Sequence, residues 1–183
     1  MIIVIRGTNG SGKSHAVRRL LDAGWLMREN LPEGSCVIRI PRVTRPVLIV
    51  GPYEQGRSMG GCDCIRQPSK IYDLIRWAEA RKFHVVLEGV VLAERPYCEL
   101  FRQGHDVRLA IFDPPFTTCL ENIRERQARK GHVSQFSIDA MKHKRKRALM
   151  MYGEARRIGM PAIKFTEPGF DGADWILSQL RSA

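Results

Sequence analysis

The stretch that most constrains the fold is residues 2–24, IIVIRGTNGSGKSHAVRRLLDAG. It begins with a β-branched apolar run, passes through a loop with glycines, and continues with apolar residues at helical spacing before Gly24. The loop has the form Gly-x-x-x-x-Gly-Lys-Ser from Gly7 to Ser14. A strand, this loop and a helix in succession predict the phosphate-binding P-loop of an α/β protein.

The residue types of this loop suit a nucleoside triphosphate. Glycines let backbone N–H groups approach phosphate oxygens, and the helix start adds positive potential. Lys13 is expected to reach the β- and γ-phosphates, and the Ser14 hydroxyl to ligate Mg²⁺. A glycine-rich turn that matches by chance is the alternative, and the flanking strand and helix disfavour it. The predicted nucleotide-binding residues are Gly7, Asn9, Gly10, Ser11, Gly12, Lys13, Ser14 and His15.

Past the loop, apolar runs typical of strands alternate with helical patterns, as in a parallel sheet covered by helices on both faces. Strands are expected at 35–40, 47–51, 83–89, 106–113 and 162–165, and helices at 69–82, about 115–130, 137–158 and after Gly172, with Ser69 as the cap of the first. We therefore expect an α/β fold: a single P-loop domain over residues 1–183, with a parallel sheet of about five strands and a small insert.

Several protein classes are disfavoured. A GTPase would need a guanine-reading Asn-Lys-x-Asp sequence, which the chain lacks, and motors and helicases normally use longer chains. No apolar run approaches the ~20 residues of a membrane span, and the first residues are too short for an export signal, so a cytoplasmic protein is expected. Five cysteines without an export signal favour free thiols, and Cys62-x-Cys64 without a matching second pair disfavours a zinc site. A small kinase fits best.

Four segments carry a resemblance: the P-loop, the strand ending VVLEG, the strand RLAIFD followed by PPFTTCLENIRERQARKG, and the late AIKFTEPG. Together they resemble the layout of the P-loop nucleoside, nucleotide and polynucleotide kinases over nearly the whole chain, although only the P-loop is highly specific. The resemblance implies ATP as donor, Glu88 near Mg²⁺, and an arginine-rich lid at about 124–135 that closes over the phosphates. Arg124, Arg126 and Arg129 match the lid arginines.

These assignments have simpler alternatives. Glu88 can be a surface carboxylate, although its place after a buried-looking strand favours the sheet edge where ligands bind. The run RERQARK can be a solvated helix face, with Glu125 paired to Arg129. A lid instead requires guanidinium groups that neutralise the transferring phosphoryl group. Pro168 and Phe170 follow the last strand, near the place of adenine in these kinases.

The segment GRSMGGCDCIRQPSK at 56–70 holds the best candidate for an acceptor-activating group. A kinase that phosphorylates a hydroxyl needs a group to orient the acceptor and take its proton. Gly60 and Gly61 allow a turn with close backbone approach, which would hold the Asp63 carboxylate beside the phosphates. The alternative is an aspartate that bonds only its own turn.

The charge of the chain indicates the acceptor. Thirty Lys and Arg residues stand against nineteen Asp and Glu, and the formal net charge is +11. The excess is concentrated in KHKRKR (142–147), ARR (155–157), RVTR (42–45) and the lid. It exceeds what a free mononucleotide needs and favours DNA or RNA, which would be bound through phosphate contacts. The alternative for KHKRKR alone is a solvated helix face.

A small basic P-loop kinase with a GGCDCI element resembles the phage-encoded 5-hydroxymethyluracil DNA kinases, which phosphorylate the base hydroxymethyl group within DNA. The resemblance implies ATP, Mg²⁺ and a DNA substrate, in a host cytoplasm if the chain is phage-encoded. Asp63 would then take the hydroxymethyl proton, and Tyr53 or Arg57 would hold the unstacked base. Arg42 and Arg45 would hold strand phosphates.

Two other classes stay open. A kinase of free deoxynucleotides or of a small metabolite would share every catalytic feature and ignore polymers. An ATP-gated nucleic-acid-binding switch would bind ATP and DNA without phosphotransfer, and Asp63→Asn would leave its activity largely intact. A glycine-set carboxylate with an arginine lid has no use in such a switch.

Overall fold

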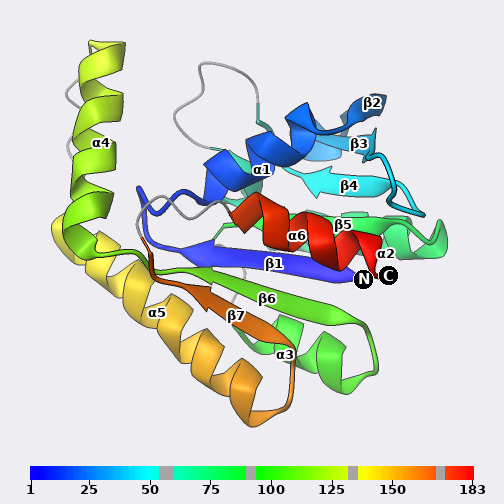
Figure 1. The fold of residues 1–183 in the computed structure, drawn as a ribbon. Helices are drawn as coiled ribbons and strands as arrows, with labels where there is room; N and C mark the ends of the chain where they lie inside the picture. The colour runs from blue at the N-terminus through cyan, green and yellow to red at the C-terminus, as the bar shows by residue number, and fades with distance from the viewer. Residues whose placement is uncertain (54–59, 90–93, 132–135, 168–171) are drawn as a thin grey trace.

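The computed structural model describes residues 1–53, 60–89, 94–131, 136–167 and 172–183 (Figure 1). They form a seven-stranded sheet of order β2-β3-β4-β5-β1-β6-β7. The strands are β1 (Ile2–Gly7), β2 (Trp25–Leu31), β3 (Ser35–Arg39), β4 (Val47–Val50), β5 (His84–Glu88), β6 (Val107–Phe112) and β7 (Ala162–Phe165). The helices are α1 (Lys13–Asp22), α2 (Pro68–Ala80), α3 (Glu94–Arg102), α4 (Phe116–Lys130), α5 (Ile138–Arg157) and α6 (Gly172–Arg181), with short 3₁₀ turns η1 (Pro32–Gly34) and η2 (Gly61–Cys64).

The sheet is larger than predicted and mixed rather than wholly parallel. Five neighbouring strands, β4, β5, β1, β6 and β7, run parallel. β3 pairs antiparallel with both β4 and β2, which extends the sheet on one side. The sequence did not predict β2, because its exposed Trp25, Leu26 and Met27 give no alternation between a buried and a solvent face.

Helices cover both faces of the sheet, as predicted. In β1, Ile2 and Val4 point to one face and Ile3 and Ile5 to the other, since side chains alternate along a strand. The first face is covered by α2, α3 and α5, and the second by α1 and α6, which lie together in Figure 1. A central strand buried on both sides explains the unbroken apolar run at the chain start.

Helix α4 extends beyond the sheet (Figure 1). Near its start, Cys119 and Ile123 pack against Met141 of α5 in a small separate cluster. Farther along, Arg124, Arg126 and other side chains are exposed. The predicted lid at about 124–135 therefore begins on a solvent-exposed helix, and residues 132–135 lie outside the described part of the chain.

Two helix starts differ from the sequence-based expectation. Ser69 is not the cap of α2, which begins at Pro68 with Gln67 as N-cap and no side-chain cap bond; the fixed φ of proline suits the first helical position. Helix α3 (Glu94–Arg102) was not predicted from the sequence. Among the described residues, no helix is both long enough and apolar enough to span a membrane.

The parallel strands bring their carboxyl ends to one edge of the sheet. The segments that follow β1, β4, β5 and β6 meet there, whereas the β3–β4 turn lies at the opposite edge because β4 runs parallel to β5 and β1. Ligands of open α/β sheets bind outside the carboxyl ends of the strands, so this edge is where a site is expected.

His84, at the start of β5, gives a stability test. It is 1% exposed, and neither ring nitrogen has a hydrogen-bond partner among the described residues. Burial, together with the positive charges of the chain amino group and Arg45, lowers the pKa of His84 from 6.5 to about 4. The unfolded chain gains a proton near pH 6.5 and the folded protein only near pH 4, so the free energy of unfolding should fall as the pH is lowered through this window.

Urea unfolding across this pH range should show a weaker pH dependence for His84→Phe than for the wild type. All other titrating groups are shared, so the difference between the two curves isolates His84. Parallel curves would contradict the lowered pKa.

Candidate active site

The loop between β1 and α1 has the form of a phosphate cradle. Gly12 is the N-cap residue of α1 in the left-handed region (φ 93°), and no side chain caps the helix start. Gly12 is exposed, while its neighbours Ser11 and Lys13 are buried. The first N–H groups of α1 thus point to an open surface, which is the arrangement that binds phosphate.

Lys13 is buried beside this loop. Its Nζ donates a hydrogen bond to the Thr8 carbonyl (2.8 Å) and lies 3.8 Å from Oε1 of Glu88. Burial lowers the pKa of Lys13, and the negative charge of Glu88 opposes this. The ammonium group therefore stands between the loop and the end of β5.

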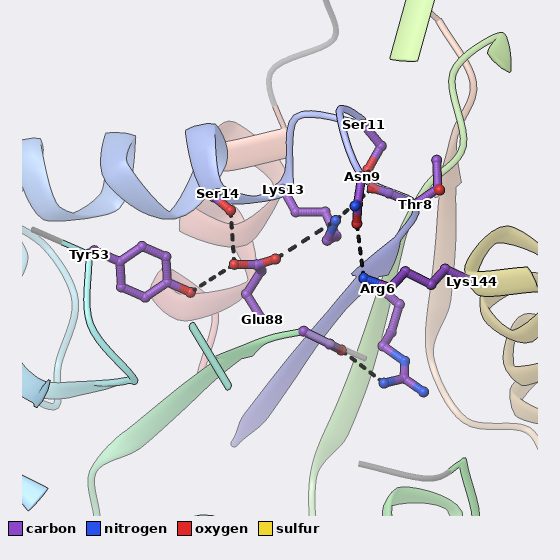
Figure 2. Close-up of polar contacts among 10 residues, drawn as sticks. Arg6, Thr8, Asn9, Ser11, Lys13, Ser14, Tyr53, Glu88 and Lys144 are labelled. Atoms are coloured by element: carbon purple, nitrogen blue, oxygen red, sulfur yellow. Dashed lines mark hydrogen bonds and ion pairs between the residues drawn. The ribbon is translucent and has the colours of Figure 1, made fainter. Parts of the chain in front are cut away.

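Glu88, at the end of β5, is the centre of the site (Figure 2). Its Oε2 accepts hydrogen bonds from the Ser14 hydroxyl (3.0 Å) and the Tyr53 hydroxyl (3.2 Å), and its side chain is 3% exposed. Burial raises the pKa of Glu88, while Lys13 lowers it. The structure thus brings together Ser14 and Glu88, the two predicted metal ligands.

This pair fits a magnesium ion. Mg²⁺ is usually held by one or two carboxylates, with substrate phosphates and water completing its oxygen shell. Ser14 and Glu88 supply a hydroxyl and a carboxylate oxygen 3.0 Å apart beside the loop. No group of three or more His, Cys, Asp or Glu within the described ranges is placed to hold a metal, which also applies to Cys62 and Cys64.

The turn that carries Asp63 packs backbone against backbone onto the end of β5. A Cβ at Gly61 (φ 70°) would lie 2.4 Å from the Glu88 carbonyl oxygen. A Cβ at Gly89 (φ 142°) would lie 2.8 Å from Oδ1 of Asp63. The predicted close approach is therefore present, and it holds the Asp63 carboxylate next to Gly89, one residue from Glu88.

Two cysteines, Cys62 and Cys64, flank Asp63. Cys62 is buried and Cys64 half-buried, and all five cysteines are free thiols. Burial raises the pKa of the Cys62 thiol, and the nearby carboxylates of Glu88 and Asp63 raise it further. Cys62 therefore stays protonated at neutral pH.

Helix α5 contacts the phosphate loop at two points. The Thr8 hydroxyl donates to the Met141 carbonyl (2.8 Å), and Lys144 Nζ donates to Oδ1 of Asn9 (3.1 Å; Figure 2). Lys144 is close enough that its charge contributes to lowering the pKa of Lys13. Two lysines, from α1 and α5, thus converge on one loop.

Sequence reasoning did not single out Lys144, because it lies inside the run KHKRKR and was treated only as part of a basic surface. The sequence does contain a pattern that indicates an inward position for Lys144. Met141 and Ala148, which are buried, lie three residues before and four residues after Lys144, so all three share one side of a helix. A lysine on the buried side of an otherwise basic helix indicates an internal partner.

The next residue, Arg145, also points inward. Its Nε donates to Oδ1 of Asp113 (2.5 Å), which follows β6 and is 9% exposed. This ion pair fixes α5 to the same sheet edge as the phosphate loop.

The predicted lid arginines lie elsewhere. Arg124, Arg126 and Arg129 are exposed on α4, and Arg129 donates to Glu125 four residues earlier (3.2 Å). Within the described residues, no hydrogen bond or ion pair joins them to the loop at Gly7–Ser14. Their observed placement is that of a solvated helix face, and a lid role stays a prediction.

The predicted substrate-binding residues do not lie together in the structure. Tyr53 lies at the site, but its hydroxyl is engaged by Glu88. Arg42 and Arg45 lie in the turn before β4, at the opposite edge of the sheet, where Arg45 lowers the pKa of the chain amino group. This position argues against their holding a strand beside Asp63. Arg57, Pro168 and Phe170 lie outside the described residues.

Two known proteins are similar in sequence to this chain. No family model matches the chain. The whole chain aligns with 97% of a Pseudomonas phage PaMx11 protein named 5-hmdU DNA kinase, at 28% identity over 200 residues. A Nucleotide-binding protein of Myxococcus xanthus is 27% identical over 130 residues, which cover 70% of this chain and 35% of that protein.

These matches support a kinase, the class that the loop and the carboxylates indicate, and a kinase implies a nucleotide donor. The chain is homologous over its full length to a phage 5-hmdU DNA kinase, so the resemblance seen in the sequence is confirmed.

The packing of the Asp63 turn can be tested by comparing Gly89→Ala with Gly104→Ala. Both positions have a positive φ, 142° and 89°, but a Cβ at Gly104 would meet nothing within 4 Å, whereas one at Gly89 would collide with Asp63. Both variants should lose stability through backbone strain, and Gly89→Ala should lose about 1–3 kcal/mol more because of overpacking. Denaturant unfolding measures the difference, and equal losses would contradict the close contact.

Proposed function

We propose that this protein is an ATP-dependent P-loop kinase that transfers the γ-phosphoryl group to a hydroxyl in DNA, namely the 5-hydroxymethyl group of 5-hydroxymethyluracil. The observation that carries this is the Asp63 carboxylate, which is held against Gly89 beside the Lys13, Ser14 and Glu88 cluster. A nucleotide-binding protein that only switches has no need of a second carboxylate fixed there. The full-length similarity to the phage kinase supports DNA as acceptor.

The donor nucleotide lies with its phosphates over the loop at Gly7–Ser14. The N–H groups at the α1 start, the Lys13 ammonium and the Lys144 ammonium neutralise phosphate charge. Ser14 would hold a Mg²⁺ ion, with Glu88 at the ion or its water, and the ion would supply further positive charge to the phosphates. Tyr53 keeps Glu88 oriented through its hydrogen bond to Oε2.

The acceptor hydroxyl approaches from the Asp63 side. Its oxygen forms a bond to the γ-phosphorus while its proton passes to the Asp63 carboxylate, and the bond between the γ-phosphorus and the β–γ bridging oxygen breaks. The products are a phosphorylated base and ADP, and the proton on Asp63 later returns to water. Asp63 suits this role because it is half-exposed, whereas Glu88 is buried.

The whole chain, residues 1–183, would act as one kinase domain, with the segment at about 124–135 as a lid. Closure would have to bring Arg124, Arg126 or Arg129 from the exposed side of α4 to the phosphates. Lys144 needs no such movement, because it already contacts the loop. The net charge of +11 favours a polyanionic acceptor over a free nucleotide.

The test is transfer of label from γ-labelled ATP, with Mg²⁺, to 5-hydroxymethyluracil DNA, thymine DNA, free 5-hydroxymethyl-dUMP and ordinary deoxynucleotides. Label should appear only on 5-hydroxymethyluracil DNA. Asp63→Asn should lower kcat by about 100-fold or more while ATP affinity is kept, because it removes the proton acceptor without removing a phosphate contact. Lys13→Ala should lower both kcat and the affinity for ATP.

Other outcomes have distinct meanings. Label on free monomers alone would make the protein a nucleotide kinase. Binding of ATP and DNA with no transfer to any acceptor would indicate a switch. An Asp63→Asn variant with wild-type kcat would contradict the assigned proton acceptor.

Lys144 can be compared directly with the lid arginines. We expect Lys144→Met to lower kcat about tenfold to 100-fold, since a charge-assisted contact is worth about 1.5–3 kcal/mol. Arg76→Met, on the exposed side of α2, is the control, because Arg76 pairs only with Asp73 in the described contacts. Steady-state kinetics at saturating ATP provide the measurement. A normal kcat for Lys144→Met and a reduced one for an α4 arginine variant would assign the charge to the lid instead.

A further inference from the structure

Helix α5 has a second side that the candidate active site does not use. An open groove of about 690 Å³ runs along it, which we name the α4–α5 groove. It is lined by Phe116 at the start of α4 and by Lys142, Arg145, Lys146, Leu149 and Met150 of α5.

Of the three cations that line the groove, Lys142 and Lys146 have no carboxylate partner among the described residues, whereas Arg145 pairs with Asp113. Lys142 and Lys146 are exposed and lie one helical turn apart. The ion pairs of α5 in the described structure involve Arg145, Glu154 and Arg157, and none includes either lysine. Two adjacent ammonium groups without carboxylate partners favour an anionic occupant.

The same groove also offers apolar surface. Met150 is 57% exposed, and Phe116 and Leu149 are half-buried, each packed against a core cluster on its inner side. An aromatic ring and a thioether beside uncompensated lysines suit a polyanion that also has flat apolar groups. Single-stranded nucleic acid has this chemistry, because its phosphates alternate with bases whose faces are exposed.

We propose that the α4–α5 groove holds an unpaired stretch of the DNA strand, with a base against Phe116 and Met150 and flanking phosphates at Lys142 and Lys146. The proposal rests on the proposed action on DNA and names the surface that binds it. Paired bases in a duplex do not present their faces, so the occupant is a single strand or an opened segment.

The nucleotide in the groove is not the one that is phosphorylated. Asp63 and Glu88 lie on the β5 side of β1, whereas Arg145, which lines the groove, pairs with Asp113 on the β6 side. The phosphate loop lies between them. The groove is thus an anchor for a more distant part of the strand, and it should affect long acceptors and not short ones.

The charge of the groove is tested with Lys142→Gln/Lys146→Gln against Arg76→Gln/Arg81→Gln, a pair from α2 and its C-cap with the same loss of charge. Fluorescence anisotropy with a single-stranded oligonucleotide of about 16 nucleotides should show binding about tenfold weaker for the groove pair and unchanged for the control. The slope of log K against log salt should fall by about 1.4, since each phosphate contact in a single strand contributes about 0.7.

The base contact is tested with Phe116→Leu, which keeps an apolar side chain and removes the aromatic face. DNA binding should weaken about fivefold, while binding of heparin, a polyanion without bases, should not change. Thermal unfolding of the variant checks that α4 still packs on α5. Equal loss for DNA and heparin would contradict a base at this position.

Kinase assays separate this proposal from the proposed function. Lys142→Gln/Lys146→Gln should raise KM for the long oligonucleotide and leave KM for one of about 4 nucleotides unchanged. If the wild-type protein binds single-stranded DNA through the groove without phosphorylating it, the proposed function is overturned and the proposal that the groove binds DNA is supported. Three outcomes would overturn the proposal that the groove binds DNA. They are equal losses of DNA binding in both neutralised pairs, no DNA binding by the wild type, and weaker binding of an ATP analogue in the groove variants.

Discussion

The site depends on one buried carboxylate. Glu88 accepts hydrogen bonds from Ser14 and Tyr53 and lies 3.8 Å from the ammonium of Lys13. A buried charge is costly unless it is paired and hydrogen-bonded, so these partners are what allow Glu88 to be ionised there. Lys13 and Ser14 follow β1 and Tyr53 follows β4, so with Glu88 at the end of β5 three strand ends meet in this cluster. The same contacts that stabilise the carboxylate therefore fix the phosphate loop, the segment after β4 and the end of β5 relative to one another.

Two glycines extend this arrangement to the side where we propose that the acceptor binds. Gly61 and Gly89 allow the η2 turn to touch the end of β5, so Asp63 is placed by backbone contact and not by a flexible side chain. On the donor side, Thr8 and Asn9 bond to α5. The groups proposed to act on the γ-phosphoryl group are thus held by contacts from two sides, which would limit how far donor and acceptor atoms can drift apart.

Local patterns predicted the parts of the molecule that depend on local sequence. The phosphate loop, the helices at both faces and the Asp63 turn follow from glycine spacing and apolar periodicity, and the structure contains them. What these patterns missed or left untested depends on tertiary position. Trp25 and its neighbours form an exposed edge strand without alternation, Arg45 lies at the far sheet edge because of strand direction, and Lys144 turns inward on a helix whose other cations face solvent.

The antiparallel extension of the sheet affects how copies of the protein behave together. β2 is the outermost strand, and it exposes Trp25, Leu26 and Met27 in a row. Such an edge is a template for pairing with another chain, and the net charge of +11 opposes this by keeping copies apart. Added salt screens that repulsion. A rise in ionic strength should therefore lower the colloidal stability of the protein and favour self-association through the exposed edge strand.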